Sequence, residues 1–207
     1  MKHSHQSLER RPDALIVALV RHGRTSWNAQ GRFLGHTDIP LDDQGLSEAR
    51  ALGQVWYGAF DEVYTSPLAR AQQTAAELAD APSSDPSWME LAQGELEGLR
   101  PEEGIERYPD FFRAWGRDPA AAVVPGGERL CDCRDRAMAA LEALVARHAP
   151  GDRVAVVTHQ VVIASIQCTI RGRPLADWRQ FRVGNTAIVG LEHVDGRWIP
   201  HAPSQSP

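Results

Sequence analysis

Short apolar runs rich in Val and Ile alternate along the chain with longer Ala- and Leu-rich segments of helical period. Buried strands produce short runs of β-branched residues, whereas helices place apolar residues three and four positions apart. A regular alternation of the two is typical of a sheet covered by helices on both faces. The sequence therefore predicts an α/β fold, a three-layer α/β/α sandwich with a mostly parallel sheet.

Turn residues between these runs set the expected boundaries. Ser66 followed by Pro67 predicts a helix with Ser66 as its N-cap, because proline suits the first helical position. Residues 82–127 are rich in proline and glycine and predict an elaborated connection of the kind that forms a lid or a substrate-selecting rim. We expect strands at 15–20, 62–65, 153–157 and 186–192, with 198–200 as an added edge strand. We expect helices at 44–57, 67–81, 132–148 and 161–170, and shorter ones at 102–108 and 110–115.

Length and charge restrict the classes of protein further. A chain of 207 residues has the size of one domain, which we expect to span residues 1–207 with an ordered core of about 13–200 between mobile ends. The formal net charge of −5 argues against a nucleic-acid-binding protein. No apolar stretch is long enough for a membrane span, and the first residues lack the apolar core of a signal peptide. We therefore expect a cytoplasmic protein whose three cysteines are reduced.

Cationic side chains follow three of the expected strands. Arg21 and His22 come after the first strand, Arg70 lies in the first turn of the helix after the second, and His159 follows the third. Ligands of open α/β sheets bind beyond the carboxyl ends of the strands, so these side chains are expected to meet. Their mutual repulsion calls for an anion, and a phosphate group matches the fork of a guanidinium. The sequence predicts a phosphate pocket.

His22 is the candidate for covalent chemistry in this pocket. A neutral imidazole held in one tautomer is a nucleophile able to form a covalent intermediate. Neighbouring arginines favour the neutral form, because like charges lower the pKa of a histidine. The adjacent Gly23 permits a close backbone approach at the turn.

The leaving group of a phosphate ester also needs a proton donor, and a carboxyl group near the pocket would supply it. Glu90 lies beside bulky apolar residues, a setting that raises the pKa of a carboxyl group towards that of a general acid. The residues themselves do not select Glu90 over Glu95 or Glu97, which belong to the same segment.

Several ordered blocks of the chain resemble the signature of the histidine phosphatase superfamily, the phosphoglycerate mutase-like enzymes. The resemblance covers roughly residues 14–192 and is specific because the blocks occur in the family's order. The blocks include Leu19-Val20-Arg21-His22-Gly23-Arg24-Thr25, Tyr64-Thr65-Ser66-Pro67-Leu68-Ala69-Arg70, Glu90 with Gly94, Pro125-Gly126-Gly127-Glu128, Val156-Val157-Thr158-His159 and Asn185.

The resemblance implies a role for each matching residue. His22 matches the histidine that is phosphorylated during turnover, and Glu90 matches the usual proton donor, which resolves the choice among the carboxyl groups. Asn28 matches a frequent phosphate contact and Gly35 a backbone position at the substrate, and the backbone amide of Gln160 can also reach the phosphate. The implied reaction uses no metal and no cofactor. The remaining members of the implied phosphate pocket are Arg21, Arg70 and His159.

Three positions depart from the family pattern. Arg24 stands where glutamate is frequent, Leu34 where a polar residue is common, and Gln160 where glycine often follows the second histidine. Arg24 either adds positive charge at the mouth of the pocket or pairs with Asp38 or Asp43. The side chain of Gln160 must point away from the phosphate or it narrows the pocket.

The function favoured by these residues is that of a phosphomonoesterase acting through phosphohistidine on a small phosphorylated metabolite. A cofactor-dependent phosphoglycerate mutase is the first alternative, since it shares the catalytic residues, but the segment after Leu91 is short for its closing insertion. A non-catalytic phospholigand-binding module is the second, and binding alone would not require Glu90. The expected partner is a small phosphate ester rather than nucleic acid or membrane, and a homodimer is left open.

Overall fold

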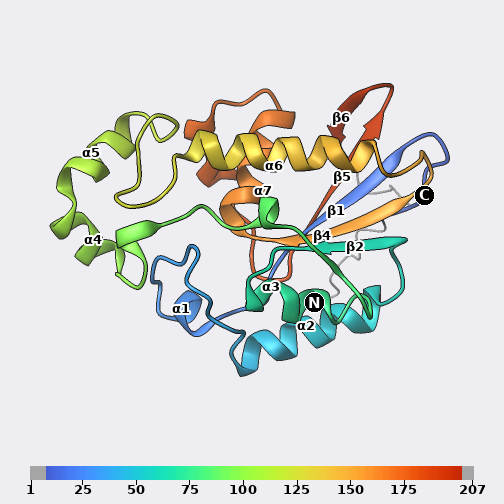
Figure 1. Cartoon of the computed structure of the whole chain (residues 1–207), viewed down its shortest axis with the longest axis horizontal. Coiled ribbons are helices and arrows are strands. Elements are labelled where there is room, and N and C mark those ends of the chain that lie inside the picture. Colours follow the sequence, from blue (N-terminus) through green and yellow to red (C-terminus); the bar gives the residue numbers. More distant parts are fainter. Residues whose placement is uncertain (1–7, 202–207) are drawn as a thin grey trace.

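A single mixed sheet of six strands forms the centre of the computed structural model, which describes residues 8–201 (Figure 1). The strand order is β3-β2-β4-β1-β5-β6, in which the first four strands are parallel, β5 pairs antiparallel with β1, and β6 pairs antiparallel with β5. The parallel strands all end at the same edge of the sheet. The bounds are β1 Leu15–Arg21, β2 Glu62–Thr65, β3 Ser83–Ser84, β4 Arg153–Thr158, β5 Ile188–Val194 and β6 Arg197–Pro200.

Helices cover both faces of this sheet, as expected for a three-layer α/β sandwich. The helices α2 (Asp43–Trp56) and α3 (Ala69–Ala75) lie on one face, and α6 (Leu130–Val145) and α7 (Gln160–Ile170) lie on the other (Figure 1). Side chains of β1 alternate between the two layers, because successive residues of a strand point to opposite faces. Leu15, Val17 and Leu19 join the core beneath α6 and α7, and Ile16, Ala18 and Val20 join the core beneath α2 and α3.

The long connection expected at 82–127 forms short helices beyond one end of the sheet. In Figure 1, α4 and α5 stand apart from the sandwich, on the side where the parallel strands end. This position makes the connection a rim around that edge. Its elements are η1 (Pro86–Trp88), η2 (Gly94–Leu96), α4 (Pro101–Arg107) and α5 (Pro109–Arg117), and the remaining short elements are α1 (Ser26–Ala29) and η3 (Leu175–Phe181).

Most boundaries differ from the sequence expectations by one to three residues, and those of α3 and β5 have a clear structural cause. Helix α3 begins at Ala69 after Leu68 as N-cap, whereas the hydroxyl of Ser66 accepts from the amide of Leu68 within the preceding turn, so Ser66 is not the cap. The helix also ends at Ala75, short of residue 81. Strand β5 begins at Ile188 rather than 186, because Thr186 has a positive φ of 55° that a strand does not accommodate.

Part of the expected mobile start packs against the body of the protein. Leu8 is only 4% exposed and belongs to the core beneath α2 and α3, and the guanidinium of Arg11 pairs with Glu192 at 2.6 Å. Residues 1–7 and 202–207 lie outside the described residues. Cys131, Cys133 and Cys168 are free thiols. Within residues 8–201, no helix has the length and apolar character needed to cross a membrane.

Candidate active site

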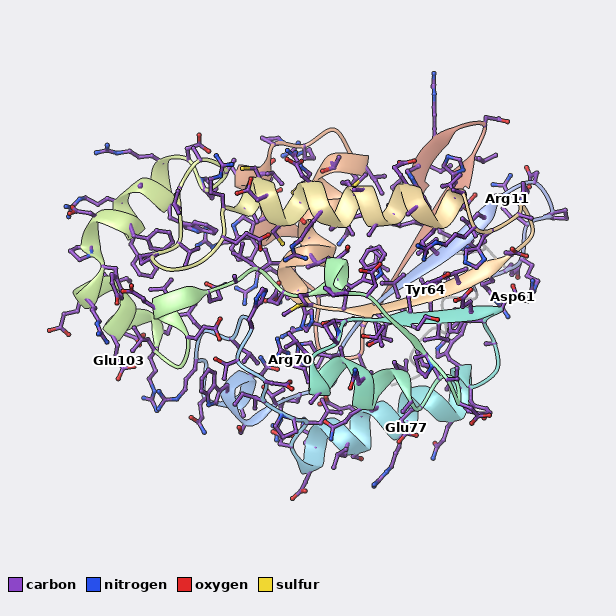
Figure 2. The ribbon with its side chains drawn as sticks, viewed as in Figure 1. Arg11, Asp61, Tyr64, Arg70, Glu77 and Glu103 are labelled. Atoms are coloured by element: carbon purple, nitrogen blue, oxygen red, sulfur yellow. The ribbon has the colours of Figure 1, made fainter. Side chains whose placement is uncertain are left out.

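The ends of three parallel strands bring His22, His159 and Arg70 to one edge of the sheet. Arg21, the last residue of β1, pairs in register with Thr158, the last residue of β4, so His22 and His159 follow side by side. Their ring centroids are 5.1 Å apart with the planes tilted by 59°. Arg70 lies in the first turn of α3, and Figure 2 shows it at the end of the sheet facing α4 and α5.

His22 is held as a neutral imidazole in a single tautomer. The ring is 3% exposed, and Nδ1 lies 2.7 Å from the carbonyl oxygen of Gly23. Because a carbonyl oxygen only accepts, Nδ1 must carry the proton and Nε2 keeps its lone pair. Burial lowers the pKa of His22 well below its usual value, and the charges of Arg70 and Arg21 lower it further. The arginines therefore act as expected, but burial is the larger cause.

Gly23 permits a close backbone approach, as expected. A Cβ at this position would lie 2.7 Å from the carbonyl oxygen of Gly45, so the close approach is to the backbone of α2. The amide of Gly23 donates to the hydroxyl of Thr74 at 3.0 Å, and that hydroxyl donates to the carbonyl of Arg70 at 2.7 Å. These bonds fix the turn after β1 against helix α3.

Arg70 is fully buried and is oriented by the backbone of the loop at 35–37. Its Nη2 donates to the carbonyl oxygen of Gly35 at 2.7 Å and its Nη1 to that of Thr37 at 3.1 Å. Burial lowers the pKa of Arg70 to about 10, so the side chain remains charged at neutral pH. Gly35 therefore positions a guanidinium with its carbonyl group.

Buried nitrogens without a partner converge on this site. Among the described residues, Nε of Arg21, Nε of Arg70 and both ring nitrogens of His159 are buried and make no hydrogen bond. Buried polar groups are nearly always paired, so donors left open together indicate a ligand. Guanidinium and imidazole donors around His22 fit the oxygens of a phosphate group.

Glu90 is the carboxyl group that the structure brings to this site. Its side chain is 6% exposed, and its two oxygens accept from the amides of Leu91 at 2.9 Å and Val161 at 3.3 Å. Burial raises the pKa of Glu90, which the arginines of the site partly oppose. The other two candidates serve elsewhere: Glu97 accepts from the amides of His36 and Thr37, and Glu95 accepts from the hydroxyl of Tyr108.

A cavity of about 600 Å³ opens from His22 and Glu90 towards α4, α5 and η3. Asn28, Leu34 and Gln160 line it, as the sequence suggested for Asn28 and Gln160. The amide of Gln160 donates to the carbonyl of Val183 at 3.1 Å, so its side chain is tied to the wall. Arg24 does not line the cavity, and its guanidinium pairs with Asp42 at 2.9 Å, not with Asp38 or Asp43.

Some cavity residues were missed by the sequence reasoning. Trp178, Arg179 and Arg182 reach the cavity from η3 and the residues after it. No motif marks this segment, and arginine is so frequent in the chain that its presence alone is no signal. Trp115 and Trp178 contact each other edge to face, with their ring centroids 6.3 Å apart.

Comparison with known proteins agrees with the geometry. The model of the histidine phosphatase superfamily, branch 1, matches residues 17–204. The chain is 33% identical to phosphoserine phosphatase 1 of Hydrogenobacter thermophilus, over 87% of each chain. It is 36% identical to a metal-independent phosphoserine phosphatase of Arabidopsis thaliana, over 88% of this chain and 78% of that one. A phosphoserine phosphatase of Entamoeba histolytica, solved with phosphoserine, superposes with a TM-score of 0.80 at 26% identity, over 91% of this chain and 95% of that one.

Proposed function

We propose, from the premise that this chain belongs to the histidine phosphatase superfamily, branch 1, that His22 becomes phosphorylated while the chain hydrolyses a phosphate monoester. The chain is a phosphomonoesterase, and the proposal assigns a role in that reaction to each residue of the site. One observation carries the assignment: the open donors of Arg21, Arg70 and His159 lie close to the imidazole of His22, whose tautomer leaves Nε2 free. A phosphoryl group bound by those donors would face this nucleophile.

The reaction proceeds in two steps. In the first, Nε2 of His22 forms a bond to phosphorus while the ester P–O bond breaks, and the leaving oxygen takes the proton of Glu90. In the second, water attacks phosphorus, the P–N bond breaks, and the carboxylate of Glu90 takes the proton of the water. Arg21, Arg70 and His159 stabilise the charge on the phosphoryl oxygens in both steps. Phosphate leaves, and both His22 and Glu90 return to their starting forms.

Asn28 and Gly35 support the site in different ways. Asn28 lines the cavity, and its side-chain oxygen Oδ1 accepts from the backbone amide of Thr25 at 3.2 Å. Because Oδ1 faces Thr25, the side-chain NH2 group of Asn28 points away from Thr25. Gly35 contributes through its carbonyl bond to Arg70 rather than by lining the cavity. Gln160 forms part of the wall. The names of the relatives make phosphoserine the first natural ester to test.

The proposal is tested with phenyl phosphate in the presence of a metal chelator. The parent protein should release phenol and, when the reaction is quenched rapidly, should carry an acid-labile phosphoryl group. His22→Ala should lose both, whereas His193→Ala, which alters a histidine on β5 outside the cavity, should keep both. Full activity of His22→Ala would remove the mechanism.

The two alternative functions give different products. A phosphoglycerate mutase given 3-phosphoglycerate would accumulate the 2-isomer, whereas this chain is expected to release inorganic phosphate. A binding module would retain the ester unchanged. A cytoplasmic location and a homodimer also belong to this proposal, and cell fractionation and sedimentation velocity test them.

A further inference from the structure

The outer half of the cavity has an apolar wall built from aromatic side chains. Phe33 contacts Phe112 with ring centroids 6.0 Å apart, Phe111 contacts Trp115 at 5.5 Å, and Trp115 contacts Trp178, which also lines the cavity, at 6.3 Å. This chain of rings joins α5 to η3. An apolar wall of this extent is typical of a pocket that binds the body of a ligand.

The same half of the cavity carries positive charge without a matching carboxylate. Arg32, Arg179 and Arg182 line it, and none of the three forms an ion pair with a described acidic residue. The only acidic side chain among the described residues of the lining is Glu90. This concentration of guanidinium groups contrasts with the formal net charge of −5 of the chain as a whole.

Among these three arginines, Arg179 and Arg182 have guanidinium groups that form no hydrogen bond to the described part of the protein. Arg32 donates to Gln30 at 2.7 Å and to the carbonyl of Gly98. The guanidinium of Arg179 instead lies 4.9 Å from the ring centre of Trp178, and Arg182 makes no hydrogen bond within the described part of the chain. Burial is the main cause that lowers the pKa of Arg179 and of Arg21, and the charge of Arg182 lowers both further, so Arg182 lies within electrostatic range of each.

A phosphate group does not satisfy this charge. The phosphoryl oxygens are matched by Arg21 and Arg70 at the strand ends, which leaves Arg179 and Arg182 at the mouth without a counter-charge. Two like charges held close together are stabilised when an anion binds between them. The volume of about 600 Å³ also lies within the range of pockets that bind ligands larger than a phosphorylated amino acid.

We propose that the mouth of the cavity is a second subsite, in which Arg179 and Arg182 bind an anionic group of the substrate while the aromatic wall contacts its apolar body. The substrate class is then a phosphate monoester whose alcohol carries both an apolar body and a second anion, either a carboxylate or another phosphate. This inference rests on the proposed function, because it places the transferred phosphoryl group at His22.

Non-hydrolysable phosphonates test the subsite without relying on turnover. Binding of methylphosphonate, benzylphosphonate and 4-carboxybenzylphosphonate to the parent protein is measured by titration calorimetry. The benzyl group should strengthen binding by about tenfold through the aromatic wall. The carboxylate should add about another tenfold through a charge-assisted hydrogen bond.

Variants locate the effect. In the double variant Arg179→Gln/Arg182→Gln, the gain from the carboxylate should vanish while benzylphosphonate binds as it does to the parent. Arg50→Gln removes an exposed arginine of α2 outside the cavity and should keep the full gain. Equal binding of the two aromatic phosphonates by the parent would overturn the anion subsite, as would an undiminished gain in the double variant. Equal binding of methylphosphonate and benzylphosphonate would overturn the role of the aromatic wall.

The phenyl phosphate assay separates this inference from the proposed function. If the parent hydrolyses phenyl phosphate but binds the two aromatic phosphonates equally, the subsite fails and the proposed function stands. If the parent prefers the carboxylated phosphonate but hydrolyses no ester, the proposed function fails and the anion subsite stands.

Discussion

Arg136 on α6 donates through Nη2 to the backbone oxygen of Glu90 at 2.9 Å. The same guanidinium donates through Nη1 to the backbone oxygen of Ser87 at 2.9 Å and pairs with both carboxylate oxygens of Glu128. Glu128 in turn accepts from the amide of Ala92 at 3.3 Å. The backbone on both sides of the proposed general acid is therefore fixed by one partly buried ion pair.

This arrangement makes Arg136 a positioning residue for Glu90. In Arg136→Met, kcat for an alkyl phosphate such as phosphoserine should fall by about 10- to 100-fold, because a misplaced acid transfers its proton poorly. Hydrolysis of 4-nitrophenyl phosphate should fall much less, since 4-nitrophenolate leaves without a proton. Arg134→Met on the same helix, which removes a guanidinium paired with Asp135, is the matched control. Equal losses on the two esters would show that Arg136 acts through general stability instead.

Replacing the general acid itself should also slow phosphoserine more than 4-nitrophenyl phosphate, and by a larger factor than Arg136→Met does. Glu90→Gln should reduce kcat for phosphoserine by about 10²- to 10⁴-fold and affect 4-nitrophenyl phosphate far less. Loss of the same size on both substrates would deny Glu90 the acid role.

The pH profile provides an independent test of Glu90. Burial raises its pKa, and only the protonated form donates, so kcat/KM for phosphoserine should fall as pH rises through that raised pKa. The ratio of parent to Glu90→Gln activity cancels the titration of the substrate. This ratio should decrease with rising pH, and a flat ratio would contradict the assignment.

Gly35→Ala should impair the phosphate pocket without adding any group to it. A Cβ at this position would lie 2.5 Å from the amide nitrogen of Gln93 and from a carboxylate oxygen of Glu97, so the loop must move. That loop holds Arg70 through the carbonyl of Gly35. Inhibition by inorganic phosphate should therefore weaken, and we expect a loss of stability of about 1–3 kcal/mol in urea denaturation.

Gly116→Ala is the control for this substitution. Gly116 lies in α5 with nothing within 4 Å of its added Cβ, so alanine should raise stability by about 0.5–1 kcal/mol and leave phosphate inhibition unchanged. Unchanged phosphate inhibition in Gly35→Ala would contradict the link between the loop and Arg70.

Two buried histidines should make the protein sensitive to acid. Burial lowers the pKa of His22 and His159 in the folded state, so below their unfolded value of about 6.5 the unfolded chain binds more protons. Stability is then present above pH 6.5 and is lost as pH falls, by about 1.4 kcal/mol per pH unit for each histidine.

Urea denaturation at pH 7, 6 and 5 measures this loss. Between pH 7 and 5 the free energy of unfolding of His159→Gln should decrease less than that of the parent. The difference should equal the contribution of one histidine. An identical decrease in the two proteins would show that His159 does not titrate on unfolding.

The strands and the strand-end residues were predictable because their signals are local. A buried parallel strand such as β4 must be an apolar run, and the residue that follows it is fixed by chain connectivity. Strand β3 carried no such signal, since Ser83 and Ser84 are exposed and polar and pair with β2 only through the backbone. The end of α3 at Ala75 was also unreadable, because Ala-rich sequence continues beyond it.

The sequence by itself determined the layered fold. It also determined where along the chain the parallel strands end and which types of side chain follow them. Tertiary structure decided that Arg24 is held by Asp42 and that Arg136 fixes the segment of Glu90. It also decided that Arg179 and Arg182 reach the cavity mouth. The physical reason is that a strand or helix imposes a repeat on its own residues, whereas a contact between distant segments depends on packing that leaves no periodic trace.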